Sequence, residues 1–283
     1  MPSIRLSGRT SLNITGEDAE NFLQNLITTD LDTLAKGDLK PGALLSPQGK
    51  ILFEFLVSRR ADGLRLDTLQ SAADDFAKRL TLYKLRAKVQ IAVDSQIHVD
   101  VSWGADSEGS EIDSSVQDRR FPDDLKVYRH YRDGVTAGEA ESIWTALRIA
   151  HGVAEAPHDY GLSDAFPHDV NLDQTGGVSF RKGCFIGQEV VSRMQHRGTA
   201  RRRILIATGA TDLPASGTPI TANDRELGAL GSVSGKTGLG LVRIDRVKDA
   251  IDSGTPILAG ETAIDLAIPP EHRFTFPVST QDA

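Results

Sequence analysis

The chain is poor in cysteine and in long apolar runs. Its 283 residues include a single cysteine, Cys184, which cannot form an internal disulfide or supply a cysteine-only zinc or iron–sulfur site. No apolar run approaches the ~18 residues that a membrane-spanning helix needs, and the first residues lack a basic-then-apolar export signal. Because an unpaired thiol also fits a reducing compartment, the sequence predicts a cytoplasmic protein with no membrane partner.

Acidic residues outnumber basic ones in the chain, 39 to 32. The formal net charge of −7 argues against a generic polyanion binder. Seven basic residues nevertheless gather around one acid, Glu189: Arg181, Lys182, Arg193, Arg197, Arg201, Arg202 and Arg203. A nucleic-acid site would need interleaved aromatic residues for base stacking, and only Phe185 lies near. Nucleic acid is therefore not an expected partner, and an anion site or a solvated strand edge both remain open.

Glycine and proline are too infrequent for a collagen-like or low-complexity chain, with 26 and 12 residues. The length suits one large domain or two to three small ones. Helical periodicity predicts helices near residues 19–27 and 71–83, the first capped by Thr15 with Asp18. Three strands between residues 44 and 70 are predicted by a Pro-Gln-Gly turn and an Asp-Gly turn. Further strands are expected near 89–93, 97–103 and 127–131.

The second half of the chain changes character. A third helix is predicted over 140–147, capped by Thr136 with Glu139 and ended by Gly152. Residues 153–185 show no period, which is typical of a functional loop. Six short strand candidates follow from Arg202 onward, separated by glycine, proline and aspartate, and predict a small β-barrel or sandwich that starts near residue 200.

The segment Lys182-Gly183-Cys184-Phe185-Ile186-Gly187-Gln188-Glu189 carries the strongest chemical signal. Two glycines flank the thiol at a predicted helix start, where free N–H groups, the helix dipole and Lys182 would favour a partly ionised, reactive thiol. A small buried hydrophobic role for Cys184 is the open alternative.

Other motifs do not predict a site. His158 and His168 recur in two Pro-His-Asp triplets without helical spacing, so we expect no metal site. Gly235-Lys236-Thr237 lacks the first glycine of a phosphate-binding loop, and the nearby Gly-Leu-Gly has no following helix.

Several segments together resemble a known family. They are SPQGK at 46–50, LYKLRAKV at 82–89, PHDVNLDQTGGVSFRKGCFIGQEVVSR at 167–193, and the RRRIL that follows. They resemble the YgfZ-type folate-binding proteins, relatives of the glycine-cleavage T-protein (aminomethyltransferase) that include a mitochondrial iron–sulfur assembly factor. The resemblance covers essentially the whole chain.

The resemblance implies an α+β, T-protein-like fold: a ring of antiparallel α+β domains, including a ferredoxin-like insertion, with a C-terminal β-barrel around a folate channel. The implied boundaries are 1–48 plus 127–198 for a discontinuous folate-binding domain, 49–126 for the insertion, and 199–283 for the barrel.

The resemblance also implies site residues. Lys182 and Cys184 match the positions expected to be catalytic. The residues expected to bind the cofactor, tetrahydrofolate, are Arg86, Asp169, Asn171, Gln188, Glu189 and Arg193. Asp169 stands where the family usually has a glutamate that recognises the pterin ring, and a carboxylate there can accept two N–H donors.

One departure separates this chain from T-proteins. Phe53-Glu54 replaces an Asp-Asp pair that includes the T-protein's catalytic carboxylate, and phenylalanine cannot carry a proton. The resemblance therefore implies a tetrahydrofolate-binding accessory protein for iron–sulfur cluster assembly or repair, which supports client enzymes such as tRNA-modifying ones and acts with the assembly machinery. A T-protein-like aminomethyltransferase and an RNA-binding module are the alternatives.

Overall fold

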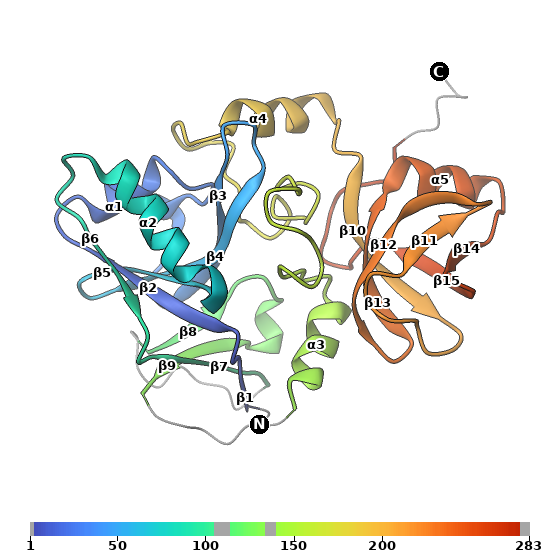
Figure 1. Cartoon of the computed structure of the whole chain (residues 1–283), viewed down its shortest axis with the longest axis horizontal. Coiled ribbons are helices and arrows are strands. Elements are labelled where there is room, and N and C mark those ends of the chain that lie inside the picture. The colour runs from blue at the N-terminus through green and yellow to red at the C-terminus, as the bar shows by residue number, and fades with distance from the viewer. Residues whose placement is uncertain (1–2, 105–113, 134–139, 278–283) are drawn as a thin grey trace. The chain divides into compact units, whose positions relative to one another are not determined.

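The computed structural model describes residues 3–104, 114–133 and 140–277, which form two compact units (Figure 1). The first unit contains residues 1–141 and 175–188, and the second contains residues 142–174 and 189–283. The N-cap predicted at Thr136 with Glu139 lies outside the described residues. None of the helices in the described part of the chain is long and apolar enough to cross a bilayer.

A nine-stranded sheet forms the first unit, in the order β1-β7-β9-β8-β3-β4-β5-β2-β6. Its strands are β1 (Ser3–Arg5), β2 (Arg9–Thr15), β3 (Asp38–Leu45), β4 (Ile51–Arg60), β5 (Gly63–Leu69), β6 (Gln90–Asp94), β7 (His98–Ser102), β8 (Ser115–Asp118) and β9 (Tyr128–Arg132). All neighbours pair antiparallel except β3 and β8, which are parallel. The three predicted strands and both predicted turns between residues 44 and 70 are confirmed.

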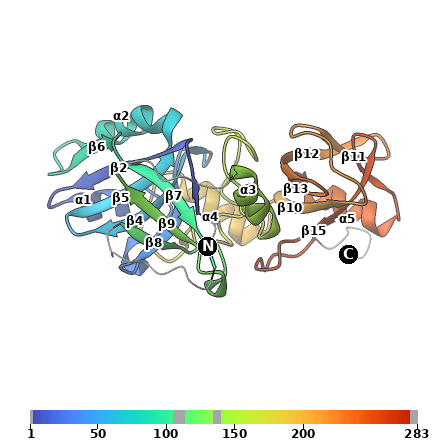
Figure 2. The same cartoon turned by 90° about the horizontal axis from the view of Figure 1, so that it is seen from below.

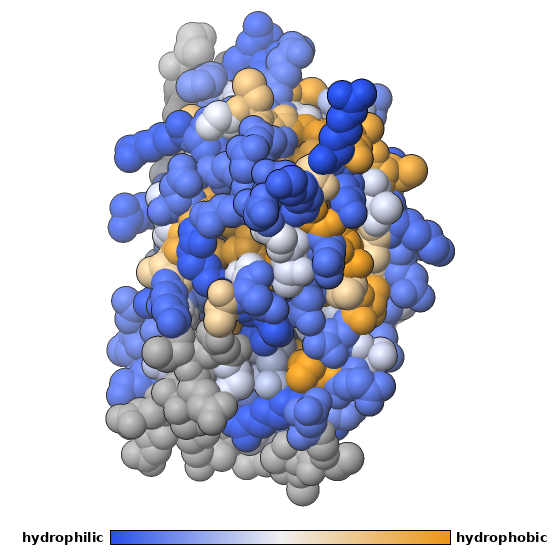
Figure 3. All heavy atoms as spheres, turned by 90° about the vertical axis from the view of Figure 1, so that its left-hand side faces the viewer, coloured by the Kyte–Doolittle hydropathy of each residue, from blue (hydrophilic) through white to orange (hydrophobic). Residues whose placement is uncertain are grey.

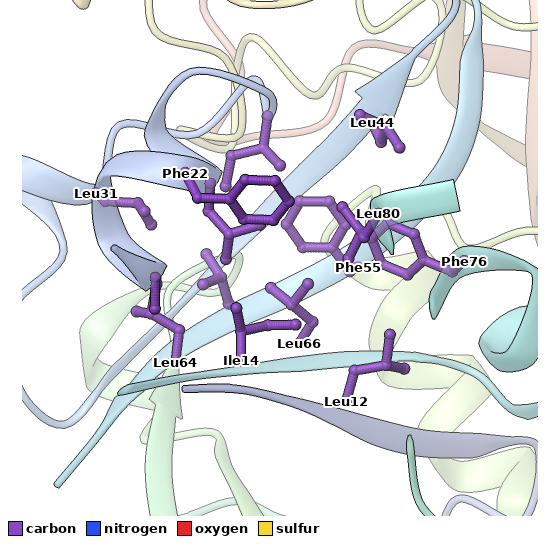
Figure 4. Packing of buried hydrophobic residues seen from close by; sticks show 14 of the residues in the cluster. Leu12, Ile14, Phe22, Leu31, Leu44, Phe55, Leu64, Leu66, Phe76 and Leu80 are labelled. Carbon is purple, nitrogen blue, oxygen red and sulfur yellow. The ribbon is translucent and has the colours of Figure 1, made fainter. Parts of the chain in front are cut away.

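Two helices, α1 (Ala19–Gln24) and α2 (Ala73–Lys84), share one hydrophobic core with this sheet (Figure 1, Figure 2). Phe22 from α1 and Phe76 from α2 pack with Phe55 of β4 and with leucines of β2 and β5 (Figure 4). Apolar residues at the helical spacing and at alternate strand positions therefore meet in one layer.

The predicted cap of the first helix is wrong. Asp18, not Thr15, is the N-cap of α1, and no side chain caps this helix. The Asp18 carboxylate instead accepts a hydrogen bond of 2.8 Å from the Lys88 backbone N–H, far along the chain.

The second unit contains most of α3 (Glu141–Ala150), most of α4 (Gln188–Arg197) and a closed barrel. Gly152 has a φ of +64° and ends α3, as predicted. Between α3 and α4 no helix or strand forms, which confirms the predicted irregular segment.

The barrel has the strand order β10-β13-β12-β11-β14-β15 and closes through β15 and β10. Its strands are β10 (Arg202–Gly209), β11 (Pro219–Ala222), β12 (Arg225–Ser234), β13 (Thr237–Arg243), β14 (Ile257–Ala259) and β15 (Thr262–Ala267). All six predicted strands are confirmed. The sequence missed α5 (Ile244–Asp252), whose Val247 and Ala250 pack into the barrel core.

The predicted boundaries at residues 48, 126 and 198 remain predictions. The nine-stranded sheet takes strands from both sides of the first boundary, because β3 pairs with β4.

Candidate functional site

The segment Ser179–Gln188, called here the cysteine loop, is tied to the connection that follows α1. The Ser179 N–H donates to the Thr28 carbonyl at 2.9 Å, and the Thr28 hydroxyl donates to the Gly177 carbonyl at 2.6 Å. The same hydroxyl accepts from the Ala43 N–H of β3 at 2.9 Å. Thr28 thus fixes the start of the loop to the sheet, a role that sequence reasoning missed.

Lys182 makes the second tether of the cysteine loop. Its Nζ donates to the carbonyl oxygens of Ile27 at 2.9 Å and Thr29 at 2.8 Å. Burial lowers the pKa of Lys182 to about 8, against the opposing effect of the nearby Asp30 and Asp32 carboxylates. Lys182 therefore positions the loop, and its catalytic role stays a prediction.

The end of the cysteine loop lies against the Ser46–Lys50 turn. Gly187 has a φ of +79°, and a Cβ there would lie 2.6 Å from the Ser46 carbonyl oxygen and 3.1 Å from the Gly49 Cα. Only glycine permits this approach. Two segments that carried the family resemblance, SPQGK and KGCFIGQE, are therefore in contact.

Cys184 is exposed at the middle of this anchored loop. The alternative of a small buried hydrophobe is wrong. The predicted helix start at the thiol is also wrong, because α4 begins at Gln188, four residues later. The Gln188 side chain instead accepts from the Phe185 N–H at 3.3 Å and closes the turn between them. The site therefore presents an accessible thiol on a loop that is anchored by hydrogen bonds of Thr28, Lys182 and Gln188.

Asp169 lies in the second unit, buried on the irregular segment before α4. Its Oδ2 accepts from the Phe166 N–H at 2.9 Å and from Arg202 Nη2 at 2.8 Å and Nε at 3.2 Å. Arg202 also pairs with the exposed Asp164 at 3.0 Å. No hydrogen bond from the described residues reaches Asp169 Oδ1.

The other predicted cofactor residues are spread over several elements. Asn171 has a φ of +58°, and its Nδ2 donates to the Ile204 carbonyl of β10 at 2.9 Å. Glu189 and Arg193 form an exposed ion pair of 2.6 Å on α4. Arg86 is exposed just after α2. The structure thus groups Lys182, Cys184 and Gln188 in one loop, while Asp169 and Asn171 share a second segment.

Phe53 stands at the position where T-proteins carry the catalytic carboxylate, and its ring packs in the hydrophobic core. Phe53 stacks on Phe76 of α2 with ring centroids 4.8 Å apart, so it belongs to the hydrophobic core. The side chain of the next residue, Glu54, accepts from Arg9 Nη1 at 3.2 Å.

Arg9 belongs to a buried ionic network that the sequence did not reveal. Its Nε donates to Asp67 Oδ1 at 2.5 Å, while Arg129 Nη1 and the Tyr131 hydroxyl donate to Asp67 Oδ2 at 3.1 and 3.0 Å. The residues come from β2, β5 and β9, so only the folded sheet brings them together. Glu54 is held at the edge of this network.

Asp159 and His168, from the two Pro-His-Asp triplets, are engaged in hydrogen bonds within the second unit. Asp159 is buried and accepts from Arg148 Nη1 at 2.9 Å and from the Ser232 N–H at 2.7 Å. The His168 Nε2 lies 3.0 Å from Gln195 Oε1, and burial lowers the pKa of His168. Within the described ranges, no group of three or more His, Cys, Asp or Glu side chains is arranged to hold a metal ion.

A cavity of about 400 Å³ lies in the second unit and falls in the size range of small-molecule sites. Met194 of α4, Arg203 of β10 and Phe274 are among the residues that line it. Arg203 is paired with Asp173 at 2.5 Å, and its guanidinium lies 4.6 Å from the Phe274 ring centroid. Two of the arginines in the basic segment, Arg202 and Arg203, are therefore neutralised by ion pairs.

Known proteins resemble both the barrel and the whole chain. Residues 201–274 match the family of CAF17 C-terminal beta-barrel domains. The mitochondrial iron-sulfur cluster assembly factor IBA57 of Homo sapiens is 29% identical over 278 residues, spanning 86% of this chain and 78% of the human protein. Its homolog from Pyricularia oryzae is 28% identical over 300 residues, spanning 92% of this chain and 76% of that protein. The chain is thus similar in sequence to the CAF17/IBA57-type iron–sulfur assembly factors.

The fold of the chain is that of the T-protein. The crystal structure of the glycine cleavage system aminomethyltransferase T from Bartonella henselae superposes with a TM-score of 0.73 over 95% of this chain and 86% of that one, at 16% identity. This result confirms the predicted α+β, T-protein-like fold with its C-terminal barrel.

The predicted cytoplasmic location is contradicted. The IBA57 proteins from Homo sapiens, Pyricularia oryzae and Coccidioides immitis are all named mitochondrial, which points to the mitochondrion. The reason for the error is physical: a free thiol indicates a reducing compartment, and this property does not distinguish the cytosol from the mitochondrial interior.

Proposed function

We propose that this chain is a tetrahydrofolate-binding accessory protein of the YgfZ type that supports iron–sulfur cluster assembly or repair, and through it client enzymes such as tRNA-modifying ones. The observation that carries the proposal is the exposed Cys184 on a loop anchored by Thr28 and Lys182. The similarity to the IBA57 proteins, which are iron–sulfur cluster assembly factors, supports it.

Cys184 is the group that we propose contacts the cluster or its carrier. A thiolate is the usual ligand of iron in these clusters, and a cluster needs about four such ligands. Because the chain has one cysteine, Cys184 can supply only one of them. The remaining ligands would come from a partner of the assembly machinery or from a client protein.

Asp169 is the residue that we propose recognises the pterin of tetrahydrofolate. Arg202 and the Phe166 N–H both bind Oδ2, so they hold the carboxylate in a fixed orientation. Oδ1 has no such partner among the described residues and is the atom proposed to accept a pterin N–H. A hydrogen bond from a pterin N–H to a carboxylate oxygen is charge-assisted and stronger than one between neutral groups.

The alternative of a T-protein-like aminomethyltransferase is weaker. The 16% identity to the Bartonella henselae protein supports the fold alone. Phe53 is packed in the core, and Glu54 is engaged with Arg9, so no free carboxylate stands at the position that T-proteins use. The RNA-binding alternative is also weaker, because Arg202 and Arg203 already form ion pairs with aspartates.

Calorimetric titration with tetrahydrofolate tests the folate half of the proposal. Asp169→Asn keeps the size of the side chain but removes its charge, and should weaken binding about 10- to 150-fold, which corresponds to about 1.5–3 kcal/mol. Asp164→Asn removes an exposed ion pair to the same Arg202 and is the matched control, with unchanged affinity expected. Equal affinities of the parent and Asp169→Asn would show that Asp169 is not part of the folate site. No binding by the parent would contradict the proposal that the protein binds folate.

A further inference from the structure

The C-terminal end of α2 presents two leucines to solvent. Leu82 is 72% exposed and Leu85 is 90% exposed, more than any other large hydrophobic side chain in the described ranges. The two residues are three positions apart and belong to the first unit. Figure 3 shows the side of the molecule that carries α1, α2 and β6, where hydrophobic residues occur in patches among hydrophilic ones.

The backbone at Leu85 is strained. This residue is the C-cap of α2 and has φ +46° and ψ −106°, a conformation that residues with a Cβ rarely adopt. Glycine is the usual residue at such a position because it has no Cβ to clash. Leu85 is therefore both strained in its backbone and almost fully exposed in its side chain, a combination that points to a function.

Basic residues are concentrated in the sequence on both sides of these leucines. Lys78, Arg79, Lys84, Arg86 and Lys88 lie in a stretch from Phe76 to Val93 that contains no acidic residue. Lys78 pairs with Asp75, and Lys88 pairs with Glu17. Within the described residues, Arg79, Lys84 and Arg86 have no ion pair, so their charge is available to an anionic surface.

We propose that the end of α2 docks on the surface of an anionic lipid bilayer, with Leu82 and Leu85 entering the headgroup region and Arg79 and Lys84 contacting lipid phosphates. Leucine and basic residues side by side are typical of proteins that lie on membranes. Protein interfaces instead depend on aromatic anchors, and leucine is under-represented among their energetic centres. The one aromatic residue here, Tyr83, packs against the core of the first unit.

This inference differs from the absence of a membrane partner expected from the sequence. That expectation rested on the lack of an apolar run long enough to span a bilayer. Binding to a bilayer surface needs only a few protruding apolar side chains and nearby positive charge, so the two statements concern different properties.

Sedimentation with lipid vesicles tests the proposal. The full chain should bind vesicles of phosphatidylcholine with cardiolipin, should bind vesicles of phosphatidylcholine alone much more weakly, and should be released by salt. Leu85→Gly should weaken binding about tenfold, since burying a leucine contributes about 1.5 kcal/mol. Arg79→Gln with Lys84→Gln should weaken it about 25-fold, at roughly fivefold for each cation.

Two controls keep the outcome interpretable. Leu85→Gly removes the side chain and relieves the backbone strain, because glycine adopts a positive φ freely. The melting temperature of this variant should therefore equal or exceed that of the parent. Ile251→Ser alters another exposed apolar side chain, in α5, and should leave vesicle binding unchanged. Equal binding to both vesicle types, no binding, or undiminished binding by Leu85→Gly would overturn the proposal. Loss of iron–sulfur support in Leu85→Gly without any vesicle binding by the parent would assign this surface to a protein partner instead.

Discussion

Cys184 illustrates how a single residue depends on distant parts of the chain. Sequence reasoning identified the thiol from its glycine and lysine neighbours, but not what holds it. Its loop is fixed by Lys182, which binds the carbonyl of Ile27, 155 positions away. A partner so far along the chain leaves no local signal, so the motif could be predicted and its anchoring could not.

The exposure of Cys184 leads to a prediction about reactivity. Iodoacetamide should alkylate this thiol in the native protein, because the side chain is open to solvent. Cys184→Ser should change the free energy of unfolding by less than about 0.5 kcal/mol, as expected for an exposed site. Mass spectrometry and a denaturant melt provide the readouts. A thiol that reacts only after unfolding would contradict the exposed placement.

His130 provides a pH-dependent prediction. Its two ring nitrogens lie 2.7 Å from the Ser102 hydroxyl and 2.9 Å from the Ser115 hydroxyl. Burial, aided by Arg132, lowers the pKa of His130 to about 4, while Asp100 opposes this shift. Between about pH 4 and pH 6.5 the unfolded chain therefore binds more protons than the folded one, and stability falls as the pH falls.

The size of this effect is measurable. Lowering the pH from 7 to 5 should cost on the order of 2 kcal/mol through His130 alone. His130→Gln, which does not titrate, should show a correspondingly smaller loss between these two pH values in urea melts. An identical loss in both proteins would show that His130 does not govern the acid response.

Secondary-structure elements followed local signals closely where those signals were strong. The turns at 46–50 and near Gly63 and the six barrel strands were predicted from glycine, proline and alternation. α5 was missed because its first residue, Ile244, continues directly from β13, and the apolar strand pattern concealed the change of period. The cap of α1 was misplaced because the Asp18 side chain binds the Lys88 backbone rather than its own helix.

The contact between the cysteine loop and the Ser46–Lys50 turn predicts contrasting effects of two glycines. Gly187→Ala should destabilise the fold by about 1–3 kcal/mol, because φ is positive and the new Cβ meets the Ser46 carbonyl oxygen. Gly183→Ala is the matched control in the same loop: a Cβ there meets nothing within 4 Å, so little change is expected. Thermal melts compare them, and equal stability of the two variants would contradict this packing.

At the scale of the whole molecule, the architecture lay beyond pattern reasoning. The sheet places β8 beside β3, and β1 beside β7, strands that are far apart in the sequence. Local periodicity predicts that such strands exist, but it does not specify their neighbours. The T-protein-like fold was predicted only through the family resemblance, whereas the α+β and all-β character of the two halves followed from composition and spacing.

The chain as a whole should lack glycine-cleavage activity. A positioned general acid or base contributes about 10²–10⁴-fold to a rate, and Phe53 cannot provide one. The assay supplies an aminomethyl-lipoyl carrier and tetrahydrofolate and measures methylene-tetrahydrofolate. Turnover of about 1 s⁻¹, within the ordinary range of enzymes, would contradict this prediction and show that the protein is an aminomethyltransferase.

Complementation of iron–sulfur enzyme activity tests the proposed function most directly. Cells that lack their own protein of this type would receive the parent chain, Cys184→Ser or Gly183→Ala, with protein levels matched by immunoblot. The parent and Gly183→Ala should restore the activity of a [4Fe–4S] enzyme, and Cys184→Ser should fail at equal abundance. Full restoration by Cys184→Ser would show that the thiol is dispensable and would contradict the role proposed for this site.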